Sequence, residues 1–366
     1  MRNNCPWASQ SPYTVVLIVP TGVGASIGGY AGDALPVARA MAETCDRLIT
    51  HPNVLNGAQL YWPNSNTFYV EGYGLDKFAR GEWGLKPVRK NRVGLILDRG
   101  IEEDLRLRHL QAADAVRATL GIYLTDYIIT DADLGVQLCD GHTEASWGTI
   151  GNPGSLLRAA EVIIRQGGAE AIAVVARFPD EENSLALQDY RHGEGVDQLA
   201  GAEAVISHLI VRTFHIPCAH APALMPLPLD PELSPRAAAE ELGYTFLPCI
   251  LVGLSNAPQF ILPTPNYTPA PEDIWAEGVD AVVVPANACG GSAILSFSNK
   301  RASIIAVFEN QTQILVPPEP LGIKAIKVNS YLEALGVLVA HRAGIDVGTL
   351  RPSLFLKHCL TQTGYQ

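Results

Sequence analysis

The stretch that decides the fold is TVVLIVPTGVGASIGGYAGDA, residues 14–34. It opens with a continuous apolar run at 15–19, the pattern of a strand buried on both faces of a parallel sheet. A loop dense in small residues follows at 20–33, and glycine lets a backbone adopt positive φ and approach a neighbour closely. Asp33 stands where it can cap a helix over 34–44. Strand, glycine-rich loop and helix in this order indicate an α/β fold.

A second stretch, residues 282–310, has a similar layout. An apolar strand ends in Val-Pro at Pro285, a loop of small residues occupies 286–293, and a further strand closes on Asn310. Duplication and chance resemblance both remain open. Two glycine-rich loops that follow buried strands suggest one shared ligand cleft, because such loops expose backbone N–H groups.

The rest of the chain alternates between Val- and Ile-rich runs and helical segments. This alternation predicts an α/β fold with mostly parallel sheets and helices on both faces, two facing Rossmann-like lobes being one form of it. Strands are predicted at 15–19, 47–50, 92–97, 171–176, 245–251, 281–284 and 304–307. Helices are predicted at 34–44, 102–120, 155–166, 199–214, 235–242 and 330–343. Long loops are predicted at 61–90 and 180–197, where no period is clear.

The domain organisation is predicted from length and from Pro-rich segments. With 366 residues the chain suits two domains or one large α/β unit. We predict an N-terminal extension at 1–12, a main α/β domain at 13–270 and a C-terminal α/β unit at 271–366. The Pro-rich stretch 256–271 then acts as a linker. The alternative is that 271–366 completes the same fold.

The charge balance restricts the partners. The net charge of −11 argues against nonspecific binding to nucleic acid or to anionic membranes, which need basic surface. A small-molecule ligand is therefore the expected partner, and self-association into a homo-oligomer is left open. An anionic ligand is still compatible with this charge, because backbone N–H groups bind anions locally.

The expected location is cytoplasmic, or the plastid stroma in a eukaryote. No apolar run reaches the roughly 18 residues that span a bilayer, and the first residues, MRNNCPW, lack the apolar core of a signal peptide. The seven cysteines are scattered and odd in number, which favours reduced thiols.

The first loop has neither standard nucleotide signature. Its glycines do not follow GxGxxG, and no lysine completes a triphosphate loop, so no dinucleotide or triphosphate cofactor is predicted and the cofactor is unknown. Its position before a helix still favours contact with an anion. The alternative is a tight structural crossing. The candidate ligand-binding residues in this loop are Thr21, Gly22, Gly24, Ser26, Gly28, Gly29 and Asp33.

Polar residues follow the next predicted strand. His51 is a candidate general acid or base, and Asn53 and Asn56 can hold an amide or a carboxylate. The carboxyl edge of a parallel sheet is where such folds bind ligands. An ordinary turn before a helix explains these residues equally well.

The second loop carries the candidate nucleophile Cys289. Between a strand and a glycine-rich turn, backbone N–H groups can lower the pKa of a thiol. A buried, unreactive cysteine is the alternative. The ligand-binding candidates around it are Asn287, Gly290, Gly291, Ser292, Glu309 and Asn310.

A third cluster offers metal ligands. His215, Cys218 and His220 fall within six residues and suit zinc or iron by residue type. Their spacing matches no standard zinc module, so turn or core positions are the alternative.

Three further segments are rich in ionisable groups. The loop at 139–149 combines thiol, imidazole, carboxylate and hydroxyl groups before a helix. Glu194 and Asp197, next to glycines, are functional candidates on a surface that is otherwise solvated. Glu203 and Ser207 lie four residues apart and share one helical face.

Several long segments together resemble a family of cyanobacteria and plastid-bearing organisms that is known only as a domain of unknown function. The segments are PTGVGASIGGYAGDA, THPNVLNGA, GGAEAIAVVARFPD, GAEAVISHLIV, ELGYTFLPCILVGLS and VVVPANACGGSAILSFS. The resemblance runs over nearly the whole chain. It implies a cyanobacterial or plastid setting and no particular activity.

The leading functional hypothesis is an enzyme that binds a small anionic metabolite, a carboxylate or a phosphorylated compound, between the two glycine-rich loops. Cys289 and His51 are its catalytic candidates, and a lyase, an isomerase or a transferase would fit. One alternative is a metal-dependent hydrolase or lyase that uses His215, Cys218 and His220. The other is a metabolite sensor or assembly factor without turnover.

Overall fold

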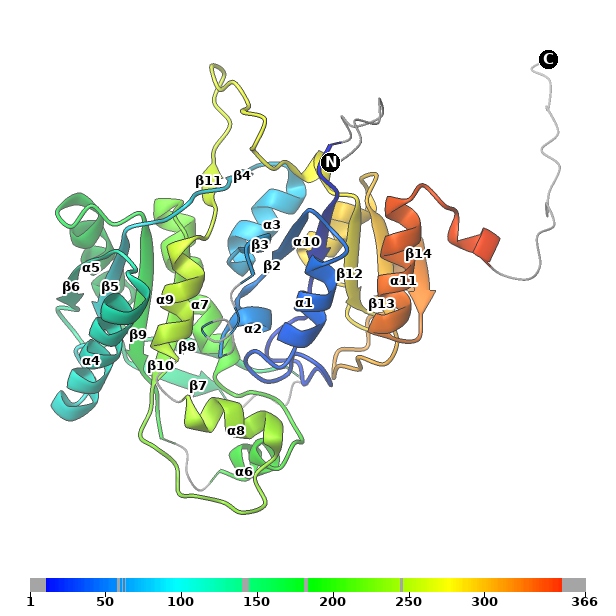
Figure 1. Ribbon diagram of the computed structural model, residues 1–366. Helices are drawn as coiled ribbons and strands as arrows, with labels where there is room; N and C mark the ends of the chain where they lie inside the picture. The colour runs from blue at the N-terminus through cyan, green and yellow to red at the C-terminus, as the bar shows by residue number, and fades with distance from the viewer. Residues whose placement is uncertain are drawn as a thin grey trace.

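The computed structural model describes residues 11–57, 60, 62, 64–139, 145–180, 184–243 and 246–350. Two mainly parallel sheets, each with helices on both faces, lie side by side (Figure 1). The predicted α/β class is therefore confirmed. We call residues 14–80 and 276–342 the first lobe and residues 93–255 the second lobe.

The sheet of the first lobe has six strands in the described residues, in the order β14-β13-β12-β1-β2-β3, and all neighbours are parallel. The chain builds outward from β1 on one side and from β12 on the other, an order compatible with a Rossmann-like lobe. The strands are β1 (Thr14–Leu17), β2 (Arg47–Thr50), β3 (Thr67–Tyr69), β12 (Ala281–Pro285), β13 (Ser303–Val307) and β14 (Ala325–Val328).

The sheet of the second lobe has four parallel strands in the described residues, in the order β10-β9-β5-β6. They are β5 (Val93–Leu97), β6 (Leu124–Ile129), β9 (Ala171–Arg177) and β10 (Cys218–Ala223). Two antiparallel ribbons complete the strands. One pairs β4 (Gly84–Lys86) with β11 (Gln259–Ile261), and the other pairs β7 (Val136–Cys139) with β8 (Trp147–Ile150).

Helices cover both sheets because the central strands have two apolar faces to bury. In the first lobe, α1 (Leu35–Ala42) and α11 (Tyr331–Arg342) pack on one face, and α3 (Gly72–Arg80) and α10 (Ser292–Ser298) pack on the other. In the second lobe, α4 (Glu103–Leu120) and α9 (Leu247–Ser255) oppose α5 (Pro153–Arg165) and α7 (Ala200–Phe214).

The remaining elements are short. They are α2 (Pro52–Leu55), α6 (Leu185–Arg191), α8 (Pro235–Leu242) and 3₁₀ turns at Ala276–Gly278, Glu319–Leu321 and Val347–Leu350. Figure 1 shows α6 and α8 together below the space between the lobes.

The largest error of the sequence prediction lies at 245–251, where a strand was expected. The chain forms helix α9 instead, and its residues Leu247, Ile250, Leu251 and Leu254 are buried in the core. A helix that lies between two lobes is apolar on nearly every side, so its sequence has no amphipathic period to distinguish it from a buried strand.

The segments expected to be long loops also hold regular structure. Residues 61–90 include β3, α3 and β4, and residues 180–197 include α6. These elements are short, which leaves little periodic signal.

The predicted boundary near residue 270 does not separate the two sheets. Strands β12, β13 and β14 join β1, β2 and β3 in one sheet, with Val15 paired to Ala281. The second lobe is thus inserted between β3 and β12. The chain leaves and re-enters the first lobe through the β4–β11 ribbon, which Figure 1 shows between the lobes.

Candidate functional site

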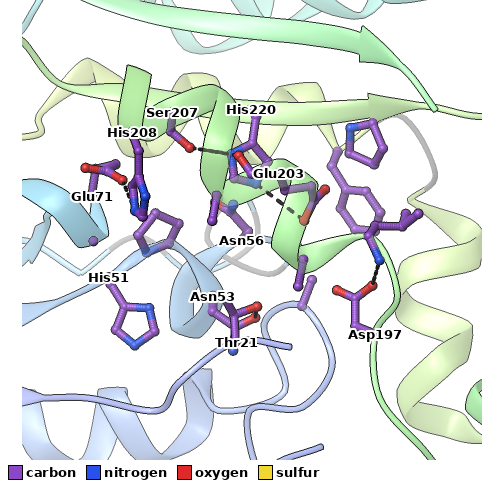
Figure 2. Close-up of a pocket in the computed structure, with 18 of the residues that line it drawn as sticks. Thr21, His51, Asn53, Asn56, Glu71, Asp197, Glu203, Ser207, His208 and His220 are labelled. Atoms are coloured by element: carbon purple, nitrogen blue, oxygen red, sulfur yellow. Dashed lines mark hydrogen bonds and ion pairs between the residues drawn. The ribbon is translucent and has the colours of Figure 1, made fainter. Parts of the chain in front are cut away.

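A pocket of about 130 Å³ lies between the two lobes (Figure 2). Its first-lobe wall is formed by segments that follow β1, β2 and β3, at the sheet edge where parallel sheets bind ligands. Its second-lobe wall is formed by α7, β10 and α8. The lining residues are Thr21, Ala31, His51, Pro52, Asn53, Asn56, Glu71, Gly72, Asp197, Leu199, Ala200, Glu203, Ala204, Ser207, His208, His220, Pro222, Glu240 and Phe246.

His51 is held as a neutral imidazole in the first-lobe wall. It follows β2 directly and is buried, and the backbone N–H of Val19 donates to its Nε2 at 3.1 Å. Burial lowers the pKa of His51 to about 4, so the ring is uncharged at neutral pH. Because Nε2 accepts, the ring proton is on Nδ1. His51 is therefore a fixed hydrogen-bond donor, and the prediction that it belongs to a ligand pocket fits its position.

The predicted ligand residues Thr21, Asn53 and Asn56 also line this wall. The hydroxyl of Thr21 donates to Asn53 Oδ1 at 3.2 Å, and Asn53 Nδ2 donates to the carbonyl of Gly28. Asn56 Oδ1 accepts from the hydroxyl of Tyr69 at 3.3 Å. These bonds fix the amides in place, so the wall is ordered before a ligand arrives.

The second-lobe wall carries a chain of hydrogen bonds through Ser207, His220 and Glu203. Ser207 Oγ lies 2.7 Å from His220 Nδ1, and His220 Nε2 lies 3.4 Å from Glu203 Oε2. With its proton on Nε2, His220 donates to the carboxylate and accepts from the Ser207 hydroxyl, whose other acceptor is the backbone carbonyl of Glu203 at 3.2 Å. Figure 2 shows these three residues across the pocket from His51, Asn53 and Thr21. A hydroxyl, an imidazole and a carboxylate in series can pass a proton.

An ion pair joins the two lobes at one side of the pocket. Glu71 follows β3, is buried, and caps α3 by accepting from the N–H groups of Tyr73 and Gly74. Its other oxygen accepts from His208 Nε2 on α7 at 2.9 Å. The carboxylate of Glu71 thus caps helix α3 of the first lobe and also binds helix α7 of the second lobe.

Two further carboxyl groups at the pocket retain protons near neutral pH. Asp197 accepts from the N–H of Leu199 at 2.9 Å at the start of α7, and desolvation together with the charge of Glu203 raises its pKa to about 7. Desolvation and the charge of Asp197 raise the pKa of Glu240 well above its ordinary value. Glu240 accepts from the hydroxyl of Tyr190 at 2.9 Å. The pair can therefore donate protons as well as accept them.

The charge of the lining selects the ligand class. Four carboxyl groups and three histidines line the pocket, and none of its described lining residues is a lysine or an arginine. An anion would meet the carboxylates of Glu71 and Glu203 here, and His208, the lining histidine whose pKa is raised, is already paired with Glu71. The pocket suits a ligand whose polar group is an uncharged hydroxyl or a cation.

The glycines of the first loop serve packing. Gly22 and Gly28 have φ of +66° and +90°, a region that residues with a Cβ rarely adopt. A Cβ on Gly28 would stand 2.5 Å from a methyl of Val19, and one on Gly29 would stand 2.2 Å from the carbonyl oxygen of Ala25. Gly24 is likewise crowded, by Gln313. These glycines are packed as in the tight crossing that was the alternative, and Thr21 of the same loop lines the pocket.

The predicted helix cap at Asp33 is wrong. Ala34 is the N-cap residue of α1, whereas the carboxylate of Asp33 accepts from the N–H of Gly28 at 2.5 Å. Asp33 therefore closes the loop on itself. Burial raises its pKa to about 6.

The segment 310–316 lies between the two glycine-rich loops and contacts both. On the first loop, the N–H of Ser26 donates to the carbonyl of Gln311 at 2.8 Å. On the second, Asn287 Nδ2 donates to the carbonyl of Thr312 at 2.8 Å. Asn310 pairs with both backbone groups of Ile27. These bonds use many of the groups predicted to hold a ligand.

Cys289 lies away from the pocket. It is fully buried, its thiol points to the carbonyls of Pro285 and Ala286, and burial raises its pKa to about 11. A thiol in this state is not a nucleophile at neutral pH. The structure therefore gives Cys289 the role of a core residue, as the alternative reading had it.

The other residues predicted around Cys289 also have structural roles. A Cβ on Gly290 would stand 2.9 Å from a methyl of Val316, and Gly291 is the N-cap residue of α10. Ser292 Oγ accepts from Arg80 at 2.8 Å. Glu309 accepts from the N–H of Tyr331 at the start of α11, at 2.6 Å.

The predicted metal ligands do not converge. His215 ends α7 and its ring packs against Trp83, Cys218 is buried in the core of the second lobe, and His220 faces Ser207. Throughout the described part of the chain, no three His, Cys, Asp or Glu side chains form a group able to hold a metal ion.

Much of the polar loop at 139–149 lies outside the described residues, namely 140–144 and the side chain of Cys139. Glu194 is not among the residues that line the pocket, whereas Asp197 is.

Sequence reasoning did not assign Glu71, Glu203, Ser207 and Glu240 to a site. The four-residue spacing of Glu203 and Ser207 was the one available signal, because it places both on one helical face. The remaining convergence depends on how the lobes pack.

No single helix in the ranges described is both long and apolar enough to cross a membrane. Helices α8 and α9 meet that test only as a pair, by length and composition, and are bent by 84°.

Comparison with known proteins gives a family. Residues 14–351 match the family described as "Protein of unknown function (DUF3326)". A protein of the cyanobacterium Synechococcus sp., described as an uncharacterized lipoprotein, is 56% identical over 353 residues, covering 95% of this chain and 97% of its own length. No solved structure matches the chain. The expected cytoplasmic location is contradicted by this relative's description, because a lipoprotein is held at a membrane by its lipid.

Proposed function

The chain belongs to the DUF3326 family, and we propose, from the geometry of the pocket between its lobes, that it is an enzyme of the isomerase or lyase type that moves protons on a small polar molecule. The observation that carries this proposal is the hydrogen-bonded series Ser207, His220 and Glu203 in the pocket wall. The sequence suggested an anionic ligand. We propose instead a ligand with an uncharged or cationic polar head, because the pocket lining is rich in carboxyl groups.

In the proposed reaction, the substrate gives a proton to Ser207 Oγ while the Ser207 proton passes to His220 Nδ1. Glu203 stabilises the imidazolium that forms. His51 donates its Nδ1–H to the oxygen on which negative charge develops, as a neutral imidazole can. The reverse transfer returns the proton to another atom of the substrate, or to a leaving hydroxyl. No proton is gained or lost over the cycle.

The test uses proton exchange, which does not require the substrate to be known in advance. The protein is incubated in D₂O with a small-molecule extract of a cyanobacterium, and mass spectrometry identifies compounds that gain deuterium or change mass. We expect His220→Gln to slow this conversion by roughly 100-fold or more, the usual contribution of a general acid–base group. His192→Gln, which changes a histidine outside the pocket lining that pairs with Asp230, should leave the rate unchanged.

An unchanged rate in His220→Gln would overturn the proposal. Ligands that bind the wild type without any conversion would favour the sensor that the sequence left as an alternative.

The short contact between Ser207 and His220 also favours a second function, acyl transfer with Ser207 as nucleophile. Here Ser207 Oγ attacks the acyl carbon, His220 passes the serine proton to the leaving group, and water then releases the acid. A fluorophosphonate probe distinguishes the two functions. Acyl transfer predicts a covalent adduct on the wild type that is absent from Ser207→Ala, and proton transfer predicts none on either.

A further inference from the structure

A second cavity of about 130 Å³ adjoins the pocket in the second lobe. Its wall is mostly aliphatic, with leucines at 138, 187, 224 and 227 and with Val196 and Met225 among its residues. An apolar cavity is poorly suited to water, and one of about 150 Å³ in another protein holds benzene. This cavity therefore has room for a ring or a short alkyl chain.

The charged groups in the wall of this second cavity already have partners. Arg191 pairs with Glu241 at 2.7 Å, and Asp180 pairs with Arg177. Ion pairs formed within the protein leave these groups satisfied without a ligand. The free surface that the cavity offers is consequently the aliphatic part.

The two cavities share part of their walls. Asp197, Leu199, Pro222, Glu240 and Phe246 line both. The polar groups of this shared wall are the two carboxyl groups, so the polarity changes at the boundary. One molecule that reached across it would meet hydrogen-bonding groups at one end and aliphatic groups at the other.

We propose that the ligand of this protein is amphiphilic, with an uncharged or cationic polar head between His51 and His220 and an apolar tail in the second cavity. The proposal rests on the proposed function for the position of the head. It adds the tail, and with it the class of molecule: a short-chain or aromatic amine, or a corresponding alcohol, rather than a fully polar metabolite.

The probes are n-alkylammonium ions from ethyl to octyl, titrated into the full chain by calorimetry. Each methylene that enters an apolar site strengthens binding about fourfold. Affinity is expected to rise at this rate with chain length and then to level off when the second cavity is full. Alkylcarboxylates of the same lengths should bind at least tenfold more weakly, because the carboxylates of the lining repel them.

Two variants test whether the apolar tail of the ligand occupies the second cavity. Leu224→Trp fills the second cavity and should remove the dependence on chain length. Leu335→Trp is the control, since Leu335 is a half-buried leucine on α11 that lines neither cavity. Circular dichroism checks that both variants are folded.

Each outcome decides the proposal. A chain-length dependence that Leu224→Trp abolishes and Leu335→Trp keeps supports it. Equal affinity for all chain lengths, an unchanged dependence in Leu224→Trp, or no binding of any alkylammonium ion overturns it. The proposed function fails separately, through an unchanged exchange rate in His220→Gln, so the two failures are distinguishable.

Discussion

At the scale of single residues, Asp197 shows how the site constrains stability. Its pKa rises from the ordinary value near 4 to about 7, mainly through desolvation, so the folded protein binds this proton more tightly than the unfolded chain. The stability linked to Asp197 is therefore complete below about pH 4 and declines as pH rises to 7. We expect Asp197→Asn to stabilise the protein at pH 8 by on the order of 1–3 kcal/mol and to have little effect at pH 4.

Urea unfolding at the two pH values measures this effect. Asp114→Asn, which changes an exposed carboxylate on α4, is the control and should give no pH-dependent gain. A stabilisation of equal size at both pH values would show that Asp197 is not the titrating group.

A glycine pair tests the role of the first loop. Gly28→Ala should destabilise the protein by roughly 1–3 kcal/mol, because φ is +90° and the new Cβ would meet Val19. Gly336→Ala on α11, where nothing lies within 4 Å of the new atom, should stabilise by roughly 0.5–1 kcal/mol. Thermal unfolding compares them, and a tolerated Gly28→Ala would refute the packing role.

At the scale of elements, the contact between α3 and α7 depends on pH through His208. Burial acts to lower the pKa of His208, but the hydrogen bond to Glu71 and the charges of Glu71 and Asp76 outweigh it and raise the pKa. The contribution of this pair is complete below the ordinary pKa of 6.5 and is lost as pH rises through the folded value. His208→Gln should remove this pH-dependent loss of stability. We expect the loss to be under about 1 kcal/mol in the free energy of unfolding, because the His208 ring is 44% exposed.

Denaturant unfolding of wild type and His208→Gln between pH 6 and pH 9 measures the difference. Parallel curves for the two proteins would contradict the prediction.

Elements with a clear period were predictable from the sequence, and elements without one were not. The helix at Glu103–Leu120 and the strand at Arg47–Thr50 lie where the pattern placed them. Helix α9 was predicted wrongly because burial on nearly every side removes the amphipathic signal. In the site, His51 was found because it directly follows a readable strand. Glu71 was not found, because β3 is three residues long.

The same limit applies to the partner groups of the site. His220 belongs to the second lobe and His51 to the first, and their approach depends on the packing of two sheets that local patterns do not describe.

At the scale of the whole molecule, the lobes share one apolar core. Leu251 on α9 belongs to the same buried cluster as Val54 of the first lobe and Val175 of the second. A shared core predicts one cooperative unfolding transition, since neither lobe can expose it alone without cost. Leu251→Ala should lower the free energy of unfolding by roughly 2–5 kcal/mol and shift the single transition as a whole. Calorimetry showing two separate transitions, of which only one shifts, would contradict this expectation.

The pairing of β1 with β12 has a consequence for biosynthesis. Val15 of β1 pairs with Ala281 of β12, which the ribosome makes only after the whole second lobe. Until then, β1 lacks one of its two neighbouring strands. At about 5–20 residues per second, this delay lasts roughly 15–50 s. During that time an apolar strand edge stays open to wrong partners, and the nascent chain needs protection from aggregation that the finished protein does not.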